Sequence, residues 1–171
     1  MAVKRVLGVG TPRNRYTSMV RALDALYRAT PPQYVGLACL LSCYLDAMAA
    51  RGGPSSKAKF LRFLRANFSQ LCAGLNGQEQ GLDGAQVFYK YYRSGLVHTF
   101  FSRNRKYAIA EDDELGGAYV GQLTHQGSSF TAVNVDRLYR DFRSLAKRRA
   151  QGASVCYLDC NARRRSLFGG F

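Results

Sequence analysis

The chain has 171 residues, 47% of them hydrophobic, which suffices for one domain with a buried core. Lys and Arg total 25 against 11 Asp and Glu, so the formal net charge is +14 and the pI is near 10.0. Such an excess of positive charge repels itself and favours a polyanionic partner. The alternatives are an anionic membrane surface, or a composition that serves solubility or reflects an Arg-rich genome.

The hydrophobic pattern argues against insertion into a membrane. The longest apolar run, residues 35–50, is interrupted by Ser42, Tyr44 and Asp46. The N-terminus has a basic start but too short an apolar run for a signal peptide. The five cysteines are an odd number, so they cannot all pair within the chain. We therefore expect a cytoplasmic protein in a reducing compartment, with no membrane partner.

The first half of the sequence predicts three helices. The first begins near Asn14 or Thr17 and ends at the prolines 31–32. The second, residues 33–50, is apolar nearly all round, which indicates the centre of a bundle. Ser55 or Ser56 caps the third, whose apolar positions extend to Leu71. The third helix is also strongly basic, carrying Lys57, Lys59, Arg62 and Arg65.

The second half mixes helix and strand. After a glycine-rich loop that ends near residue 84, the aromatic stretch 88–101 predicts a fourth helix. Residues 106–110 and 118–123 predict two short strands, with the acidic run 111–114 in the hairpin loop between them, and a third short strand is expected at 129–133. Asn134 caps a last helix that ends at the basic residues 147–149.

The predicted fold class is therefore mainly α: a four- to five-helix bundle with a small antiparallel β-hairpin inserted before the last helix. Residues 1–150 form a single helical domain. Residues 151–171 form a basic C-terminal tail that is mobile or docks its aromatic side chains on the domain.

The aromatic helix carries the clearest chemical signal. Arg93 and His98 lie five residues apart around Gly95, and His98 is one of two histidines in the chain. Arginine is a permanent donor to phosphate oxygens, and histidine gives or takes a proton near neutral pH. Together they suit RNA transesterification without a metal. On one α-helix the two residues lie about 140° and roughly 7.5 Å apart, so a single protomer does not point both at one atom.

Residues 93–98, an arginine, a small polar residue, glycine, two apolar residues and a histidine, resemble the Rx4–6H signature of the HEPN superfamily. This resemblance implies a helical bundle, a metal-independent ribonuclease with no cofactor, and a composite site at a homodimer interface. It implies that Arg93 and His98 are the catalytic pair. Ser94 takes the polar position beside the arginine, where the family more often has asparagine. Residues 1–150 would then be a HEPN-like domain.

A second group of residues suits nucleic-acid binding, with RNA favoured over DNA. Aromatic side chains alternate with basic ones along residues 88–107, a pattern that fits stacking on unpaired bases. At helical spacing, half or more of these rings are expected in the core. An α-helix does not turn Tyr91 and Tyr92 inward as well as Phe88 and Tyr89, so the others are expected at the surface. The candidate contacts are Lys90, Arg103, Arg105, Lys106, Arg62 and Arg65.

Two alternatives stay open at this point. The same basic surface fits a non-catalytic RNA- or DNA-binding helical module, and the helices fit a structural or regulatory bundle without a nucleic-acid partner. We predict no metal site: Cys39 with Cys43, and Cys156 with Cys160, have a spacing typical of helix packing and not of zinc knuckles.

Overall fold

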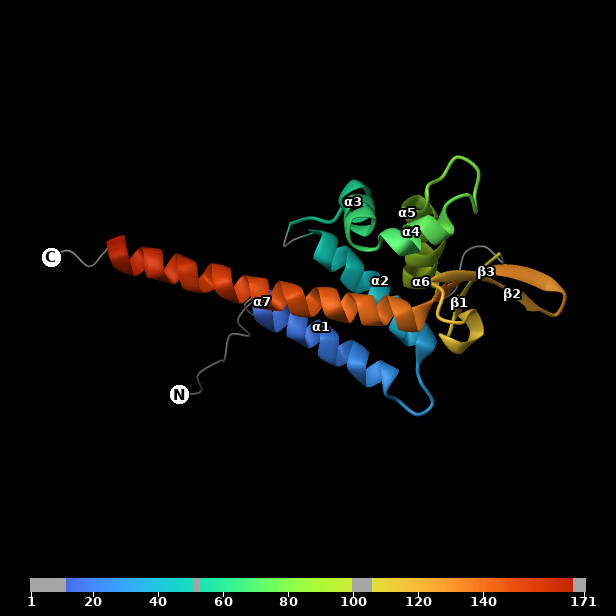
Figure 1. Cartoon of the computed structure of the whole chain (residues 1–171), viewed down its shortest axis with the longest axis horizontal. Coiled ribbons are helices and arrows are strands. Elements are labelled where there is room, and N and C mark those ends of the chain that lie inside the picture. The colour runs from blue at the N-terminus through green and yellow to red at the C-terminus, as the bar shows by residue number, and fades with distance from the viewer. Residues whose placement is uncertain (1–11, 51–52, 100–105, 168–171) are drawn as a thin grey trace. The chain divides into compact units, whose positions relative to one another are not determined.

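The computed structural model describes the backbone of residues 12–50, 53–99 and 106–167, and the side chains of residues 15–50, 53–96 and 106–152. The fold is mainly helical with a small three-stranded mixed sheet (Figure 1). The chain divides into two compact units, residues 23–142 and residues 1–22 with 143–171. Among the described residues no helix is both long and apolar enough to cross a bilayer.

The larger unit holds most of the helices. They are α2 (Tyr34–Ala50), α3 (Lys57–Asn67), α4 (Ser69–Leu75), α5 (Gly84–Val87), η1 (Phe88–Arg93) and α6 (Ser94–Thr99). Helix α2 contributes to the core: Leu37, Leu41 and Leu45 are fully buried, and the helix packs against both α3 and α6. Ser56 caps α3 by accepting a hydrogen bond from the Lys59 N–H, also as predicted.

The predicted third helix is in fact two. It breaks at Phe68, whose φ of −133° and ψ of 48° are not helical, and α4 starts at the next residue. The break turns the chain so that Phe68 itself is buried and its ring lies 6.0 Å from that of Phe63. Burying this aromatic side chain explains why the apolar pattern continued across a helix boundary.

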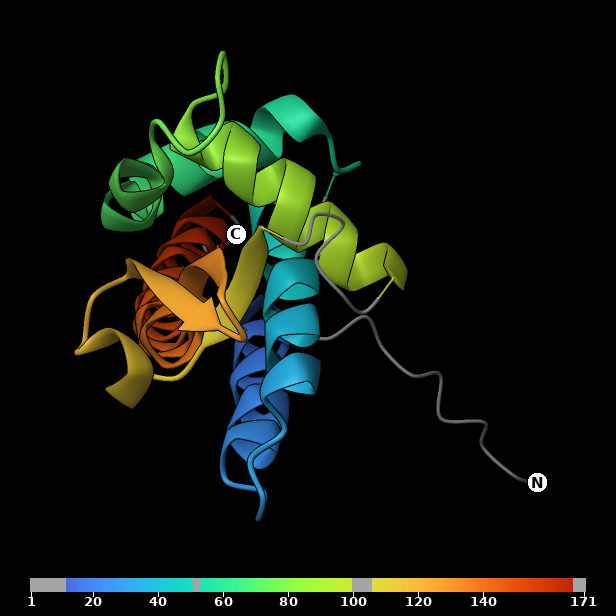
Figure 2. The same ribbon diagram turned by 90° about the vertical axis from the view of Figure 1, so that its right-hand side faces the viewer.

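The predicted helix over residues 88–101 begins earlier, at Gly84, where Asp83 and Gln86 form a reciprocal capping box. Its middle, η1, is a π-helical segment, in which the Ser94 N–H reaches back to the Tyr89 carbonyl. The helix is described as far as Thr99. Figure 2 shows α5, η1 and α6 running as one continuous helix that crosses α2.

The sheet differs from the predicted hairpin. Strand β1 (Tyr107–Ala110) pairs in parallel with β3 (Ser128–Asn134), and β2 (Val120–His125) pairs antiparallel with β3. The predicted pairing of residues 106–110 with 118–123 is therefore wrong, because β3 lies between these two strands. The hairpin that does form joins β2 to β3 through Gln126 and Gly127, both with positive φ, as a two-residue turn requires.

The acidic residues 111–114 take part in contacts that the sequence did not reveal. Residues 113–115 form a short 3₁₀ turn, η2 (Asp113–Leu115), and Asp112 accepts hydrogen bonds from the side chains of Asn134 and Arg140. These hydrogen bonds hold the pKa of Asp112 below its usual range, and the bond from Asn134 has the largest effect. Asn134 also accepts from the Arg137 N–H at 2.9 Å, so it caps α7 (Val135–Leu167) as predicted.

The smaller unit contains the first residues of α1 (Pro12–Tyr27) and the later part of α7. Met19, Leu145 and Ala146 are its buried apolar side chains among those described. The last helix does not stop at the basic residues 147–149, because α7 continues to Leu167. Residues 151–167, predicted as a tail, are therefore helical.

Gly84 packs directly on α4, and this contact gives a stability prediction. A Cβ at position 84 would collide with the Cys72 carbonyl, which is backbone and cannot swing away. We expect Gly84→Ala to lower the free energy of unfolding by about 1–3 kcal/mol, the range for overpacking. Gly152 is the matched control, since it is also helical and a Cβ added there would have no neighbour within 4 Å. Gly152→Ala should stabilise by about 0.5–1 kcal/mol through helix propensity. Urea unfolding measures the stability of both variants, and equal effects would contradict the close contact between Gly84 and the Cys72 carbonyl.

Candidate functional site

The centre of the candidate site is the pair of Arg93 and Asp46. Arg93 is the last residue of η1, and its Nη2 lies 2.7 Å from Oδ2 of Asp46 on α2. Both side chains are half-buried, with 19% and 16% of their surface exposed. The Arg93 guanidinium also lies 5.3 Å from the centroid of the Tyr89 ring. Contacts on two sides fix the arginine in one orientation.

Asp46 is held in turn by a second partner. The Ser55 hydroxyl, in the segment between α2 and α3, donates to the other carboxylate oxygen, Oδ1. A carboxylate with both oxygens engaged is a rigid anchor for the guanidinium. One donor of Arg93 stays unused: its Nε is buried and has no hydrogen-bond partner among the described residues.

Helix α6 is fixed against α2 just beyond Arg93. The Cys39 thiol donates to the Leu96 carbonyl at 3.3 Å, and Leu96 is buried. Burial raises the pKa of the Cys39 thiol, so the group is neutral near pH 7. Burial also raises the pKa of Cys43, an effect that the charge of Arg93 partly offsets. Cys39 is therefore a packing group between the two helices, whereas Cys43 is exposed, and within the described residues no cluster of three metal-ligating side chains occurs.

Of the three predicted catalytic residues, the structure describes two side chains. Ser94 directly follows Arg93 and is half-buried at the start of α6. His98 belongs to the same helix, and its side chain lies outside the described residues. The separation of Arg93 and His98 therefore stays a prediction from helical geometry.

The predicted nucleic-acid contacts differ in how far they already interact with other residues of the chain. Arg65 is paired with Asp83 at 2.5 Å, and Lys90 lies over the Tyr91 ring at 4.7 Å from its centroid. Lys106 is exposed, and Arg103 and Arg105 lie outside the described residues. Arg62 is exposed and, among the described residues, forms no hydrogen bond or ion pair. Arg62 is thus the α3 cation most available to a ligand.

The aromatic side chains of this helix are mostly in the core, more of them than helical spacing predicts. Phe88, Tyr91 and Tyr92 are all buried, and Tyr89 is half-buried. The expectation that these rings could not all turn inward assumed an α-helix, whereas the wider π-helical turn shifts successive side chains by a smaller angle. Tyr91 stacks on Tyr107 with centroids 4.4 Å apart, and the Tyr92 hydroxyl donates to the Thr131 carbonyl at 2.8 Å.

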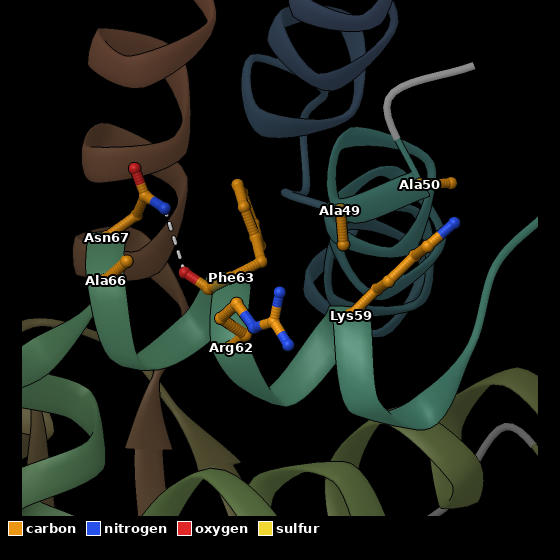
Figure 3. Close-up of a pocket in the computed structure, with 7 residues that line it drawn as sticks. All are labelled: Ala49, Ala50, Lys59, Arg62, Phe63, Ala66 and Asn67. Carbon is orange, nitrogen blue, oxygen red and sulfur yellow. Dashed lines mark hydrogen bonds between the residues drawn. The ribbon is translucent and has the colours of Figure 1, made fainter. Parts of the chain in front are cut away.

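A hollow lies between the end of α2 and one side of α3 (Figure 3). Its volume is about 390 Å³, within the range of roughly 300–1,000 Å³ that small-ligand sites occupy. The lining residues are Ala49, Ala50, Lys59, Arg62, Phe63, Ala66 and Asn67. A second, shallower hollow on α3 shares Arg62 and Ala66 and is completed by Ala58, Leu61 and Arg65.

Sequence reasoning missed Asp46, Ser55 and this hollow. Asp46 is the single acid in an otherwise apolar helix, and that isolation was the available signal for a buried ionic partner. No protein-family model, curated protein or solved structure matches the chain. The resemblance of residues 93–98 to the HEPN signature therefore stays a prediction.

Proposed function

We propose that this protein is a HEPN-like, metal-independent ribonuclease that acts as a homodimer through Arg93 and His98. The observation that carries the proposal is the fixed Arg93, whose guanidinium is anchored by Asp46 at 2.7 Å while 19% of its side chain stays exposed. The packing of α2, α3, η1 and α6 agrees with a helical bundle around this motif.

The proposed reaction is cleavage of the RNA chain by its own 2′-hydroxyl. One His98 accepts the 2′-hydroxyl proton, and the 2′-oxygen attacks phosphorus. The bond from phosphorus to the 5′-oxygen then breaks, and His98 of the partner subunit supplies the proton that the 5′-oxygen needs. Arg93 stabilises the extra negative charge on the phosphoryl oxygens. The products are a 2′,3′-cyclic phosphate and a 5′-hydroxyl.

Helical geometry supports the proposed dimer. Residues 94–99 are α-helical, which agrees with the expected separation of about 140° and roughly 7.5 Å between Arg93 and His98 and so favours a site that two chains share. Two copies related by a twofold axis bring the same surface of each chain together. The proposed centre therefore contains both motifs.

Cleavage of RNA in excess EDTA tests the proposed reaction. The full chain is incubated with a mixed-sequence single-stranded RNA, and the products are separated on a denaturing gel. We expect fragments ending in a cyclic phosphate, with unchanged yield when EDTA is added. Intact RNA throughout, at protein concentrations that saturate binding, would contradict the ribonuclease.

A non-catalytic RNA- or DNA-binding module is the second candidate. Arg62, which has no hydrogen-bond or ion-pair partner in the described part of the chain, and the exposed Lys90 and Lys106 favour it, because they provide positive charge without requiring His98. This candidate predicts steeply salt-dependent binding and no cleavage. A structural bundle without a nucleic-acid partner predicts neither binding nor cleavage of RNA.

A further inference from the structure

We propose that the hollow between α2 and α3 binds one unpaired nucleotide of an RNA strand, with its phosphate on Arg62 and its base against Phe63 and the surrounding alanines. This inference rests on the RNA-binding part of the proposed function and not on cleavage. It names how the strand is held and where it lies relative to Arg93.

The lining of the hollow combines the two surfaces that a nucleotide needs. Ala49, Ala50, Ala66 and Phe63 provide the apolar wall, while Lys59 and Arg62 provide the cations. Figure 3 shows that Lys59, Arg62 and Phe63 come from α3, and that Ala49 and Ala50 come from α2. Unpaired bases bind apolar and aromatic side chains, and guanidinium groups bind phosphate, so this lining matches both parts of a nucleotide.

Some polar groups of the hollow already form hydrogen bonds within the chain, and the others are available to a ligand. The Lys59 ammonium donates to the Pro54 carbonyl at 3.1 Å, a neutral acceptor that leaves the amine unpaired with any acid among the described residues. Asn67 donates from Nδ2 to the Phe63 carbonyl at 2.8 Å, which fixes the orientation of its amide. Arg62, without a partner in the described part of the chain, stands where the two α3 hollows meet. A phosphodiester on Arg62 is therefore positioned at the junction between them.

The hollow is close to the Arg93 site along α2. Ala49 and Ala50 follow Asp46 by three and four residues, which places them on the same side of the helix about one turn, or roughly 5.4 Å, further on. Ser55, which donates to Asp46, lies in the segment that leads into Lys59. A strand whose cleaved phosphate contacts Arg93 would thus place a neighbouring nucleotide at the hollow.

Binding measurements with an uncleavable strand test the inference. Fluorescence anisotropy follows a short single-stranded RNA whose 2′-hydroxyls are methylated, at several salt concentrations. Arg62→Ala is compared with Arg28→Ala, a control at an exposed arginine that lines neither hollow. We expect Arg62→Ala to raise Kd about tenfold more than the control and to reduce the salt slope by about one phosphate contact.

Ala66→Leu separates the base from the phosphate. This substitution fills the hollow without changing charge, and position 66 is exposed and helical, so the fold should tolerate it. We expect Kd for the single strand to rise about tenfold with an unchanged salt slope, as for the loss of one stacked base. Kd for an RNA duplex should not change, because a paired base cannot enter the hollow.

Several results would overturn the inference. They are an unchanged Kd for Ala66→Leu, an equal loss for duplex and single strand, or an Arg62→Ala effect no larger than that of Arg28→Ala. Adenosine monophosphate and inorganic phosphate are added as competitors. Phosphate alone would block a simple anion site, whereas a nucleotide site requires adenosine monophosphate. Because the strand cannot be cleaved, these outcomes are independent of whether the protein is a ribonuclease.

Discussion

Replacing His98 with alanine is expected to reduce the rate of RNA cleavage in EDTA by about 10²- to 10⁴-fold, the contribution of general acid–base catalysis. The proposed centre takes both its base and its acid from the two copies of His98, so the substitution removes both proton-transfer groups at once. RNA binding should persist, because binding depends on the basic surface that includes Arg62, Lys90 and Lys106. Single-turnover cleavage and anisotropy on the same preparation check the two statements together.

The other histidine provides a matched control. His125 is exposed at the end of β2, so His125→Ala makes the same chemical change away from the motif. It should leave both cleavage and binding within about twofold of wild type, as for surface substitutions in general. Equal losses for the two alanine variants would show that His98 has no special role in the reaction.

Replacing Asp46 with asparagine is expected to slow cleavage by about 10- to 100-fold through the position of Arg93. The amide keeps the shape of the carboxylate but removes its charge, so the half-buried guanidinium loses its anchor at 2.7 Å. The free energy of unfolding should fall by about 1–3 kcal/mol, as when a hydrogen bond to a charged group is lost. The effect should appear in kcat with little change in the Kd for RNA, because Asp46 acts through Arg93.

Two variants make the Asp46 result specific. Asp46→Glu restores the charge and should recover part of the lost rate. Glu79→Gln removes the carboxylate from a weak, exposed pair with Lys90 at 4.0 Å, and should change stability by less than about 0.5 kcal/mol. If Asp46→Asn loses stability but keeps a normal kcat, the ion pair stabilises the fold and does not position Arg93 for cleavage.

The helices could be located from the sequence because local signals agree with the tertiary structure. Ser56 and Asn134 cap α3 and α7 as their side-chain chemistry predicts. The π-helical segment in η1 could not be predicted, since it depends on packing Phe88, Tyr91 and Tyr92 into one core. Strand pairing also failed, because the sheet order depends on contacts between residues far apart in the chain, such as Tyr107 with Thr131.

The candidate site was only half visible in the sequence. Arg93 and His98 stood out because their spacing and chemistry are unusual within one aromatic helix. Asp46 did not, since its partner lies 47 positions away and no local pattern joins them. The hollow was hidden for the same reason: it exists only where the alanines of α2 meet the basic side of α3.

The most direct test of a composite site uses a dimer with one wild-type protomer and one protomer carrying both Arg93→Ala and His98→Ala. Two affinity tags allow this mixed dimer to be purified, and a doubly tagged wild-type dimer serves as the reference for cleavage in EDTA. Because the proposed centre needs both motifs, the mixed dimer should cleave RNA at less than about a hundredth of the reference rate. Half of the reference rate, or full activity from a protein that stays monomeric, would contradict the account.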